Sequence, residues 1–154
     1  MAPGEGPPQR RGLRLCLVVS RFNEPVTRRL ERSARRCLEA AGVQPANIEV
    51  LYVPGAWELP LGDRLALDHA AYHGVIALGC VIRGETPHFE YVSMGATMGL
   101  ETIARESGVP IGFGLLTTEN GDQAFSRAGG EKGDKGEDAA LAVLAMCDLA
   151  ARLK

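Results

Sequence analysis

Apolar runs and stretches with helical spacing alternate along the chain from Leu13 to its end. Continuous apolar runs predict four buried strands, at residues 13–20, 47–53, 74–82 and 111–117. Apolar residues at helical spacing predict helices over residues 25–41, 60–72, 89–107, 123–127 and 136–153. Gly42 and Gly108 lie where helices should end, and Pro60 lies where one should begin. Strands that alternate with helices and are continuously apolar predict an α/β fold with a parallel sheet covered on both faces.

Two of the predicted helices are apolar nearly all round, whereas an exposed helix should carry a polar face. They contain the runs 94–100 and 139–146, and the first run includes small residues that permit close approach of another helix. Deep burial inside one domain would explain both. In a chain of 154 residues each helix should cover only one face of the sheet, so we favour contacts between subunits.

Length and composition indicate one domain at residues 12–154, after a flexible Pro/Gly-rich N-terminus at residues 1–11. The net charge of −2 is made of mixed signs, without the basic stripe typical of proteins that bind nucleic acid or membrane surfaces. The four cysteines form no CxxC pair, which favours buried thiols in a reducing compartment over disulfides or metal ligands. No apolar run has transmembrane length and the start lacks a signal-peptide core, so we expect a cytoplasmic protein.

Charged and titratable residues follow the third predicted strand, where open α/β sheets place their chemistry. The turn 83–87 delivers His88 just before the next helix, and imidazole is the side chain that exchanges protons near neutral pH. Backbone N–H groups of residues 84–86 ahead of a helix suit phosphate, although many turns look similar. His69 and His73 lie in and just after the second helix, and we interpret them as surface or structural residues.

The loops after the other strands offer further candidates. Phe22 is either a core residue or a stacking platform beside the amide of Asn23. Trp57 sits in a loop stiffened by prolines, and either anchors that loop or contacts a ligand. Arg127 is suited to bidentate phosphate binding. The Gly/Lys-rich segment 129–136 after it is either a mobile surface connection or an anion-binding edge.

The chain resembles the 6,7-dimethyl-8-ribityllumazine synthase family over nearly its whole length from about Leu13. Five blocks occur in the family's order and together are highly specific: S-R-F-N (20–23), P-G-A-W-E-L-P (54–60), G-C-V-I-R-G-E-T-P-H-F-E-Y-V-S (79–93), F-G-L-L-T-T-E (113–119) and R-A-G-x-x-x-G-x-K-G-x-x-A-A (127–140).

The resemblance implies a condensation of 5-amino-6-(D-ribitylamino)uracil with 3,4-dihydroxy-2-butanone 4-phosphate, the penultimate step of riboflavin biosynthesis. It implies a transferase that uses no metal or organic cofactor. The implied fold is a three-layer αβα sandwich on a four-stranded parallel sheet, of flavodoxin-like topology. The implied assembly is a homopentamer, or a sixty-subunit shell of pentamers, with active sites between neighbouring subunits. Riboflavin synthase is a candidate partner.

The resemblance also implies a role for each site residue. The ribitylaminouracil would be held by Phe22, Asn23, Ala56, Trp57, Glu58, Val81 and Ile82. Its site would be completed from a neighbouring subunit by Phe113 and Lys135. The phosphate would be bound by Gly84, Glu85, Thr86 and the neighbour's Arg127. Catalysis would rest on His88, which transfers protons, and on Arg127, which offsets the charge of the departing phosphate.

Some positions depart from the family's usual pattern. Glu131 stands where Lys is common and Asp134 where Asn is common, so the loop before Lys135 is more acidic than usual. The N-terminal prolines remove donors for a strand that could join a neighbour's sheet, which argues against a shell. Segment 129–136 lacks the insertion of members that stop at pentamers, which favours the shell.

Two other functions stay open. The first is a non-catalytic flavin- or lumazine-binding protein of the same fold, in which Phe22 and Trp57 stack a bound isoalloxazine. Thr86, His88 and Arg127 argue against it, because stacking needs no phosphate clamp and no proton-transfer group. The second is a flavodoxin-like mononucleotide binder. That class expects a phosphate-binding Ser/Thr/Gly run after the first strand, where this chain has R-F-N.

Overall fold

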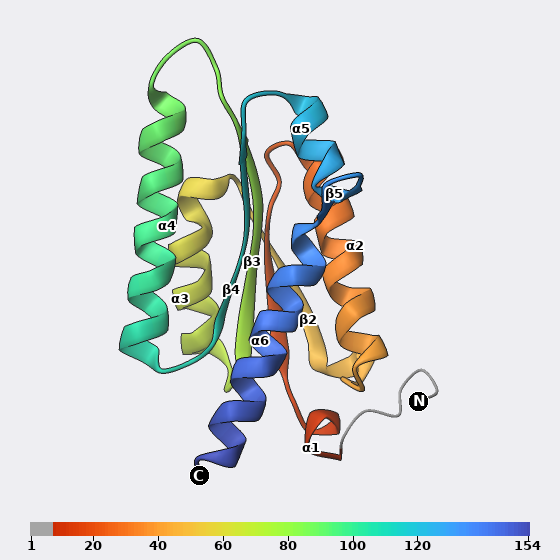
Figure 1. Ribbon diagram of the computed structural model, residues 1–154. Helices are drawn as coiled ribbons and strands as arrows, with labels where there is room; N and C mark the ends of the chain where they lie inside the picture. The colour runs from red at the N-terminus through yellow and green to blue at the C-terminus, as the bar shows by residue number, and fades with distance from the viewer. Residues whose placement is uncertain (1–7) are drawn as a thin grey trace.

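A four-stranded, all-parallel sheet forms the centre of the molecule, with the strand order β2-β1-β3-β4 (Figure 1). The computed structural model describes residues 8–154. The strands are β1 (Leu15–Ser20), β2 (Ile48–Val53), β3 (Gly74–Ile82) and β4 (Ile111–Thr118). All four occur where the sequence predicts them. In this order β2 and β4 are the edge strands, so one side of β4 has no strand of residues 8–154 beside it.

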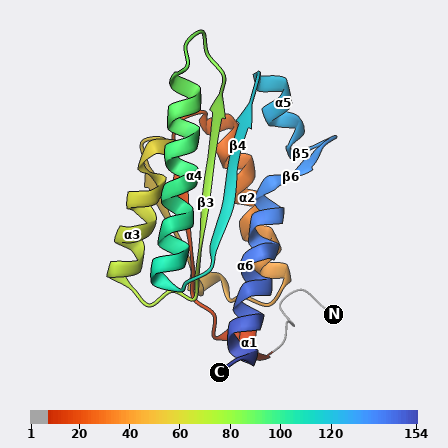
Figure 2. The same cartoon turned by 60° about the vertical axis from the view of Figure 1, so that its left-hand side comes forward.

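Helices cover both faces of the sheet and give three layers (Figures 1 and 2). On one face lie α2 (Glu24–Ala40) and α6 (Lys135–Arg152), and on the other lie α3 (Leu59–His69) and α4 (His88–Ser107). Side chains alternate along β1, so Leu17 packs with the α2–α6 layer and Val18 with the α3–α4 layer. The α/β sandwich expected from the sequence is confirmed.

Short elements connect these layers. They are α1 (Pro8–Arg11), η1 (Pro45–Asn47), η2 (Ala56–Glu58) and α5 (Gly121–Ser126). Arg10 joins α1 to α6 through an ion pair of 2.7 Å between its Nη2 and Oδ2 of Asp148. The predicted flexibility of the N-terminus concerns mostly residues 1–7, which lie outside the described residues.

The segment after Arg127 contains a small antiparallel hairpin, β5 (Ala128–Gly130) with β6 (Gly133–Asp134). The sequence predicted only a Gly/Lys-rich loop there. Gly129 and Gly133 adopt φ of 93° and 101°, a region that glycine enters at no steric cost. Strands of two or three residues are too short to show a period-two pattern, so this hairpin could not be recognised from hydrophobicity.

One side of the apolar helix α4 packs against its own chain, and another side faces outward. Gly95 and Gly99 pack against Trp57 and Pro60 of the same chain, so its small residues serve contacts within the subunit. Met94 and Met98 point outward and are 59% and 62% exposed. In α6, Leu141 and Met146 are each half exposed. These outward apolar side chains support the prediction of subunit contacts for part of each helix only.

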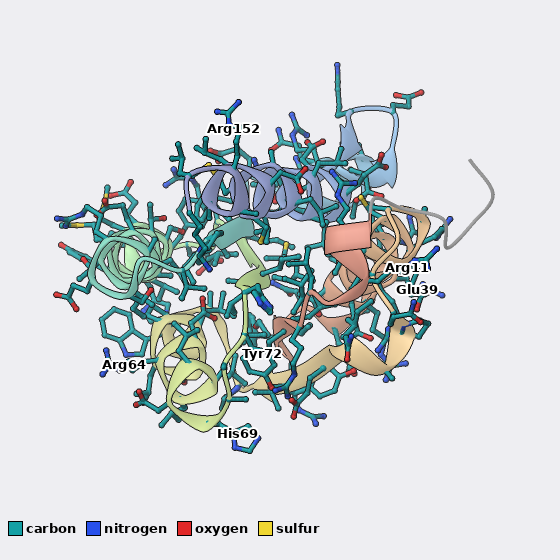
Figure 3. All side chains as sticks on the ribbon, turned by 90° about the horizontal axis from the view of Figure 1, so that it is seen from below. Arg11, Glu39, Arg64, His69, Tyr72 and Arg152 are labelled. Atoms are coloured by element: carbon teal, nitrogen blue, oxygen red, sulfur yellow. The ribbon has the colours of Figure 1, made fainter. Side chains whose placement is uncertain are left out.

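The cysteines and two of the histidines are structural or exposed. All four cysteines are free. Cys16, Cys80 and Cys147 are buried as predicted, whereas Cys37 on α2 is only half-buried. His69 is exposed and points away from α3 (Figure 3). His73 is also exposed, and its Nδ1 accepts a hydrogen bond of 3.0 Å from the backbone N–H of Arg14. Within residues 8–154, none of the helices combines the length and hydrophobicity that crossing a bilayer requires.

Candidate active site

A cavity of about 710 Å³ lies at the carboxyl ends of β1, β2 and β3, beside the first turns of α4. Most of the residues predicted to form the site line it: Phe22, Ala56, Trp57, Glu58, Val81, Ile82, Gly84, Thr86 and His88. The structure adds residues that the sequence had not singled out: Gly55, Cys80, Phe89, Tyr91 and Val92. Several loops distant in sequence therefore converge on one site, as parallel α/β sheets arrange them.

The turn after β1 presents Phe22 as an exposed aromatic side chain, with 67% of its surface accessible. Asn23 follows with φ 60° and is the one non-glycine residue among residues 8–154 with a positive φ. Its Nδ2 donates a hydrogen bond of 2.8 Å to the carbonyl oxygen of Cys80 at the end of β3. The amide thus ties the turn to the sheet and holds Phe22 at the cavity. Asn23 itself does not appear among the residues that line the cavity.

Trp57 is both an anchor and an exposed side chain. Its ring lies so close to Gly95 of α4 that a Cβ at position 95 would overlap it. The side chain is nevertheless 62% exposed. Both interpretations of Trp57 from the sequence are therefore compatible with its position. Glu58 lies beside it in η2, half-buried, and lines the same cavity.

The turn after β3 is fixed by Arg83, a residue to which the sequence analysis assigns no role. Its Nε lies 2.8 Å from Oε2 of Glu119, its Nη1 lies 3.4 Å from Oε1 of Glu90, and its guanidinium stacks 4.7 Å from the ring of Phe89. The backbone N–H of Arg83 donates to the carbonyl of Thr118 at the end of β4. These contacts hold the exposed segment from Gly84 onwards against the sheet.

His88 is the first residue of α4 and is exposed to the cavity. The N–H groups of a helix's first turn point outward without intrahelical partners, and they favour an anion there. Thr86 and Gly84 lie just ahead of this helix end and line the cavity as well. Glu85 is exposed in the same turn but is not part of the lining.

The remaining predicted residues form a second group, along the open edge of β4. Phe113, Arg127 and Lys135 line a separate hollow of about 350 Å³. The Nζ of Lys135 lies 6.0 Å from the ring centroid of Phe113. The guanidinium of Arg127 donates to the carbonyl oxygen of Gln123 and to Oγ of Ser126, at 3.0 and 3.2 Å. None of the three lines the His88 cavity, so one chain does not bring the two groups together.

The chemistry of the cavity is that of aromatic faces, a carboxylate, an imidazole and a helix N-terminus. Burial raises the pKa of the Cys80 thiol to about 11, so this side chain stays protonated and unreactive near neutral pH. Among residues 8–154, no three His, Cys, Asp or Glu side chains are grouped in a way that could hold a metal ion. The arrangement can stack a planar ring, hold an anion and exchange protons.

Comparisons with known proteins agree with this arrangement. The family model for 6,7-dimethyl-8-ribityllumazine synthase matches residues 12–151. The 6,7-dimethyl-8-ribityllumazine synthase of Gemmatimonas aurantiaca is 49% identical over 149 residues, covering 97% of this chain and 91% of that protein. The enzyme of the same name from Nitratidesulfovibrio vulgaris is 46% identical over 91% of this chain and 90% of its own length. That of Clostridium kluyveri is 41% identical over 97% of both chains. The chain therefore belongs to the 6,7-dimethyl-8-ribityllumazine synthase family.

Proposed function

We propose that the chain condenses 5-amino-6-(D-ribitylamino)uracil with 3,4-dihydroxy-2-butanone 4-phosphate to give 6,7-dimethyl-8-ribityllumazine, phosphate and water. This is a transferase reaction of riboflavin biosynthesis. The observation that carries the proposal is the family match over residues 12–151, together with relatives of that name at 41–49% identity. The cavity at the strand ends supplies side chains of the types this condensation needs.

The pyrimidine substrate is assigned to the aromatic end of the cavity. Phe22 and Trp57 present large exposed surfaces there, which suits stacking against a planar uracil ring. The end of β3 supplies the polar backbone of Val81 and Ile82 for the ring edge. Glu58 is the carboxylate of this cavity that is available to hydroxyl groups of the ribityl chain.

The butanone phosphate is assigned to the segment 84–86 ahead of α4. The free N–H groups of the helix start and its dipole favour a phosphate there. His88 lies at the same place and is assigned the proton transfers. The substrate amine adds to the ketone and loses water to form an imine. Removal of a proton from the adjacent carbon then expels phosphate and leaves an enol, which tautomerises to a ketone. The ribitylamino nitrogen attacks this ketone and closes the ring with loss of a second water.

Phe113, Arg127 and Lys135 are assigned to the cavity of a neighbouring subunit. They lie together on the open edge of β4 and away from their own chain's cavity, which supports a shared site. A homopentamer is the proposed assembly, and the outward Met94 and Met98 of α4 are suited to its contacts. A sixty-subunit shell, riboflavin synthase as a partner and a cytoplasmic location stay predictions from the sequence.

The test is formation of the lumazine from both authentic substrates, followed by absorbance, with and without a metal chelator. We expect product at the same rate in both samples. Absence of product, or its complete loss on chelation, would contradict the proposal. A purified protein that carries a yellow chromophore and shows no turnover would favour a flavin- or lumazine-binding function instead.

A further inference from the structure

A groove lined by arginines lies beside the β5–β6 hairpin and is separate from the hollow of Arg127. It has a volume of about 470 Å³ and is lined by residues of α2, the β5–β6 hairpin and the start of α6. Figure 1 shows α2 beside β5 and the start of α6. Arg29, Arg32 and Arg36 line it from α2. They are spaced three and four residues apart, which places their side chains along one face of the helix.

These three arginines differ from the other two of the same helix. Arg28 is paired with Glu24 at 2.8 Å, and Arg35 is paired with Glu39 at 3.3 Å. For Arg29, Arg32 and Arg36, by contrast, no carboxylate of the described residues lies within 4.0 Å of the guanidinium. All three are exposed. Helix α2 therefore carries two arginines that are paired with carboxylates and three that are not paired with any carboxylate of the described residues.

The side chain of Arg29 is held in place by an aromatic ring of α5. Its guanidinium carbon lies 4.8 Å from the centroid of the Phe125 ring in α5. A cation over an aromatic face keeps its charge and most of its N–H donors, because the ring uses neither. The contact reduces the side-chain entropy that a ligand would otherwise have to remove.

The two carboxylates at the groove leave a positive balance. Oδ1 of Asp134 accepts hydrogen bonds from the backbone N–H groups of Gly136 and Glu137, at 3.0 and 3.2 Å. Asp134 is thus engaged as the N-cap of α6. Glu137 is the remaining carboxylate and is exposed. Three guanidinium groups therefore face two carboxylates, of which Glu137 alone is not engaged by the start of α6, and the formal charge of the groove is positive.

We propose that this groove binds a small ligand that carries two or more phosphoryl groups. Arg29 and Arg36 are separated by about 10 Å along the helix axis, too far for one phosphate to reach both ends of the row. Guanidinium groups suit phosphoryl oxygens because they donate in a planar fork. The volume lies in the range of small-molecule sites, between about 300 and 1,000 Å³. The argument is independent of the proposed function, since none of these arginines lines the His88 cavity.

The direct test is calorimetric titration of the purified protein with sodium tripolyphosphate at constant ionic strength. The chain offers a matched pair of variants on the same helix. Arg32→Gln with Arg36→Gln removes two unpaired charges, whereas Arg28→Gln with Arg35→Gln removes two paired ones. We expect the first pair to weaken binding by roughly tenfold or more, and the second to change it less than about twofold.

Two single variants separate the groove from its neighbours. Glu137→Gln should tighten tripolyphosphate binding, because it removes the uncommitted carboxylate. Arg127→Gln should remove at most the tripolyphosphate that binds at the proposed active site, because Arg127 lines the hollow beside β4 and does not line the groove. The binding that depends on Arg32 and Arg36 should remain. Lumazine formation without tripolyphosphate should persist in all α2 variants, which would show that they fold.

Three results would overturn the proposal. One is the absence of measurable tripolyphosphate binding to the unmodified protein. Another is an equal loss in both double variants, which would indicate a general effect of net charge. The third is the loss of all tripolyphosphate binding in Arg127→Gln while both α2 double variants keep it, which would place the ligand at the proposed active site. Each of these results leaves the proposed condensation standing, because lumazine formation is measured separately.

Discussion

The ring of Trp57 lies against the bare backbone of Gly95, at a position where any side chain would overlap it. This contact joins the loop after β2 to α4, the helix that begins with His88. Trp57 lines the cavity, and Gly95 belongs to α4, whose first turns lie beside the cavity. This contact therefore fixes the position of the exposed part of Trp57 at the cavity.

Replacing Gly95 by alanine should displace the Trp57 ring and loosen the loop. We expect a loss of about 1–3 kcal/mol of stability from overpacking, together with a raised KM for ribitylaminouracil. Steady-state kinetics and thermal unfolding measure the two effects. Gly121→Ala is the control, because a Cβ there has open space around it. Unchanged kinetics in Gly95→Ala would show that the Trp57 position does not matter for substrate.

Asp63 should make stability depend on pH. Its side chain lies fully buried in α3, and neither carboxylate oxygen has a hydrogen-bond partner among the residues that the structure describes. Burial raises the pKa of the Asp63 carboxyl well above its ordinary value. The folded chain thus holds this proton more tightly than the unfolded chain, whose Asp pKa is about 3.9. The stability that this bound proton contributes is complete below the unfolded pKa and is lost as the pH rises towards the pKa of Asp63 in the folded chain.

The stability of the neutral variant Asp63→Asn should therefore increase relative to that of the unmodified chain as the pH rises. We expect a small difference in Tm near pH 4.5, and an advantage of about 1–3 kcal/mol for the variant at pH 8. Asp68→Asn is the control on the same helix, since Asp68 is largely exposed and paired with Arg64. Parallel curves of Tm against pH for Asp63→Asn and the unmodified chain would refute the buried proton.

The sequence predicted the sheet and its covering helices because their signals are local. β3 begins and ends at the predicted residues, Gly74 and Ile82, and Gly108 ends α4 with a left-handed φ of 69°. Asp63 could also have been noticed, because it shares a helix face with Leu59 and Ala66, both buried.

The features that the sequence did not predict depend on distant contacts. Arg83 gains its role from Glu119 and Phe89, which are positioned by other elements. The division of the site between a cavity and the edge of β4 depends on strand order, which hydrophobic periodicity does not determine. It was predicted only through the resemblance carried by the five blocks, which assigns Phe113, Lys135 and Arg127 to a neighbouring subunit.

Arg127 and His88 should affect different kinetic constants. Arg127→Ala should raise the KM for the butanone phosphate, because a guanidinium is lost from the phosphate site. His88→Ala should chiefly lower kcat, by roughly 10²-fold or less, since much of the rate comes from holding two substrates together. Initial rates over a grid of both substrates separate these effects, and His69→Ala is the control. An unchanged KM and turnover in Arg127→Ala would show that the phosphate assignment is wrong.

The central claim is that each active site joins the cavity of one subunit to the β4 edge of another. The most direct measurement mixes His88→Ala and Arg127→Ala chains, dissociates and reassembles them, and records lumazine formation at low butanone phosphate. Some cavities with an intact His88 will then meet an edge with an intact Arg127. A shared site predicts recovery to roughly a quarter of the unmodified activity for random mixing. A mixture no more active than the average of its two parents would contradict the account.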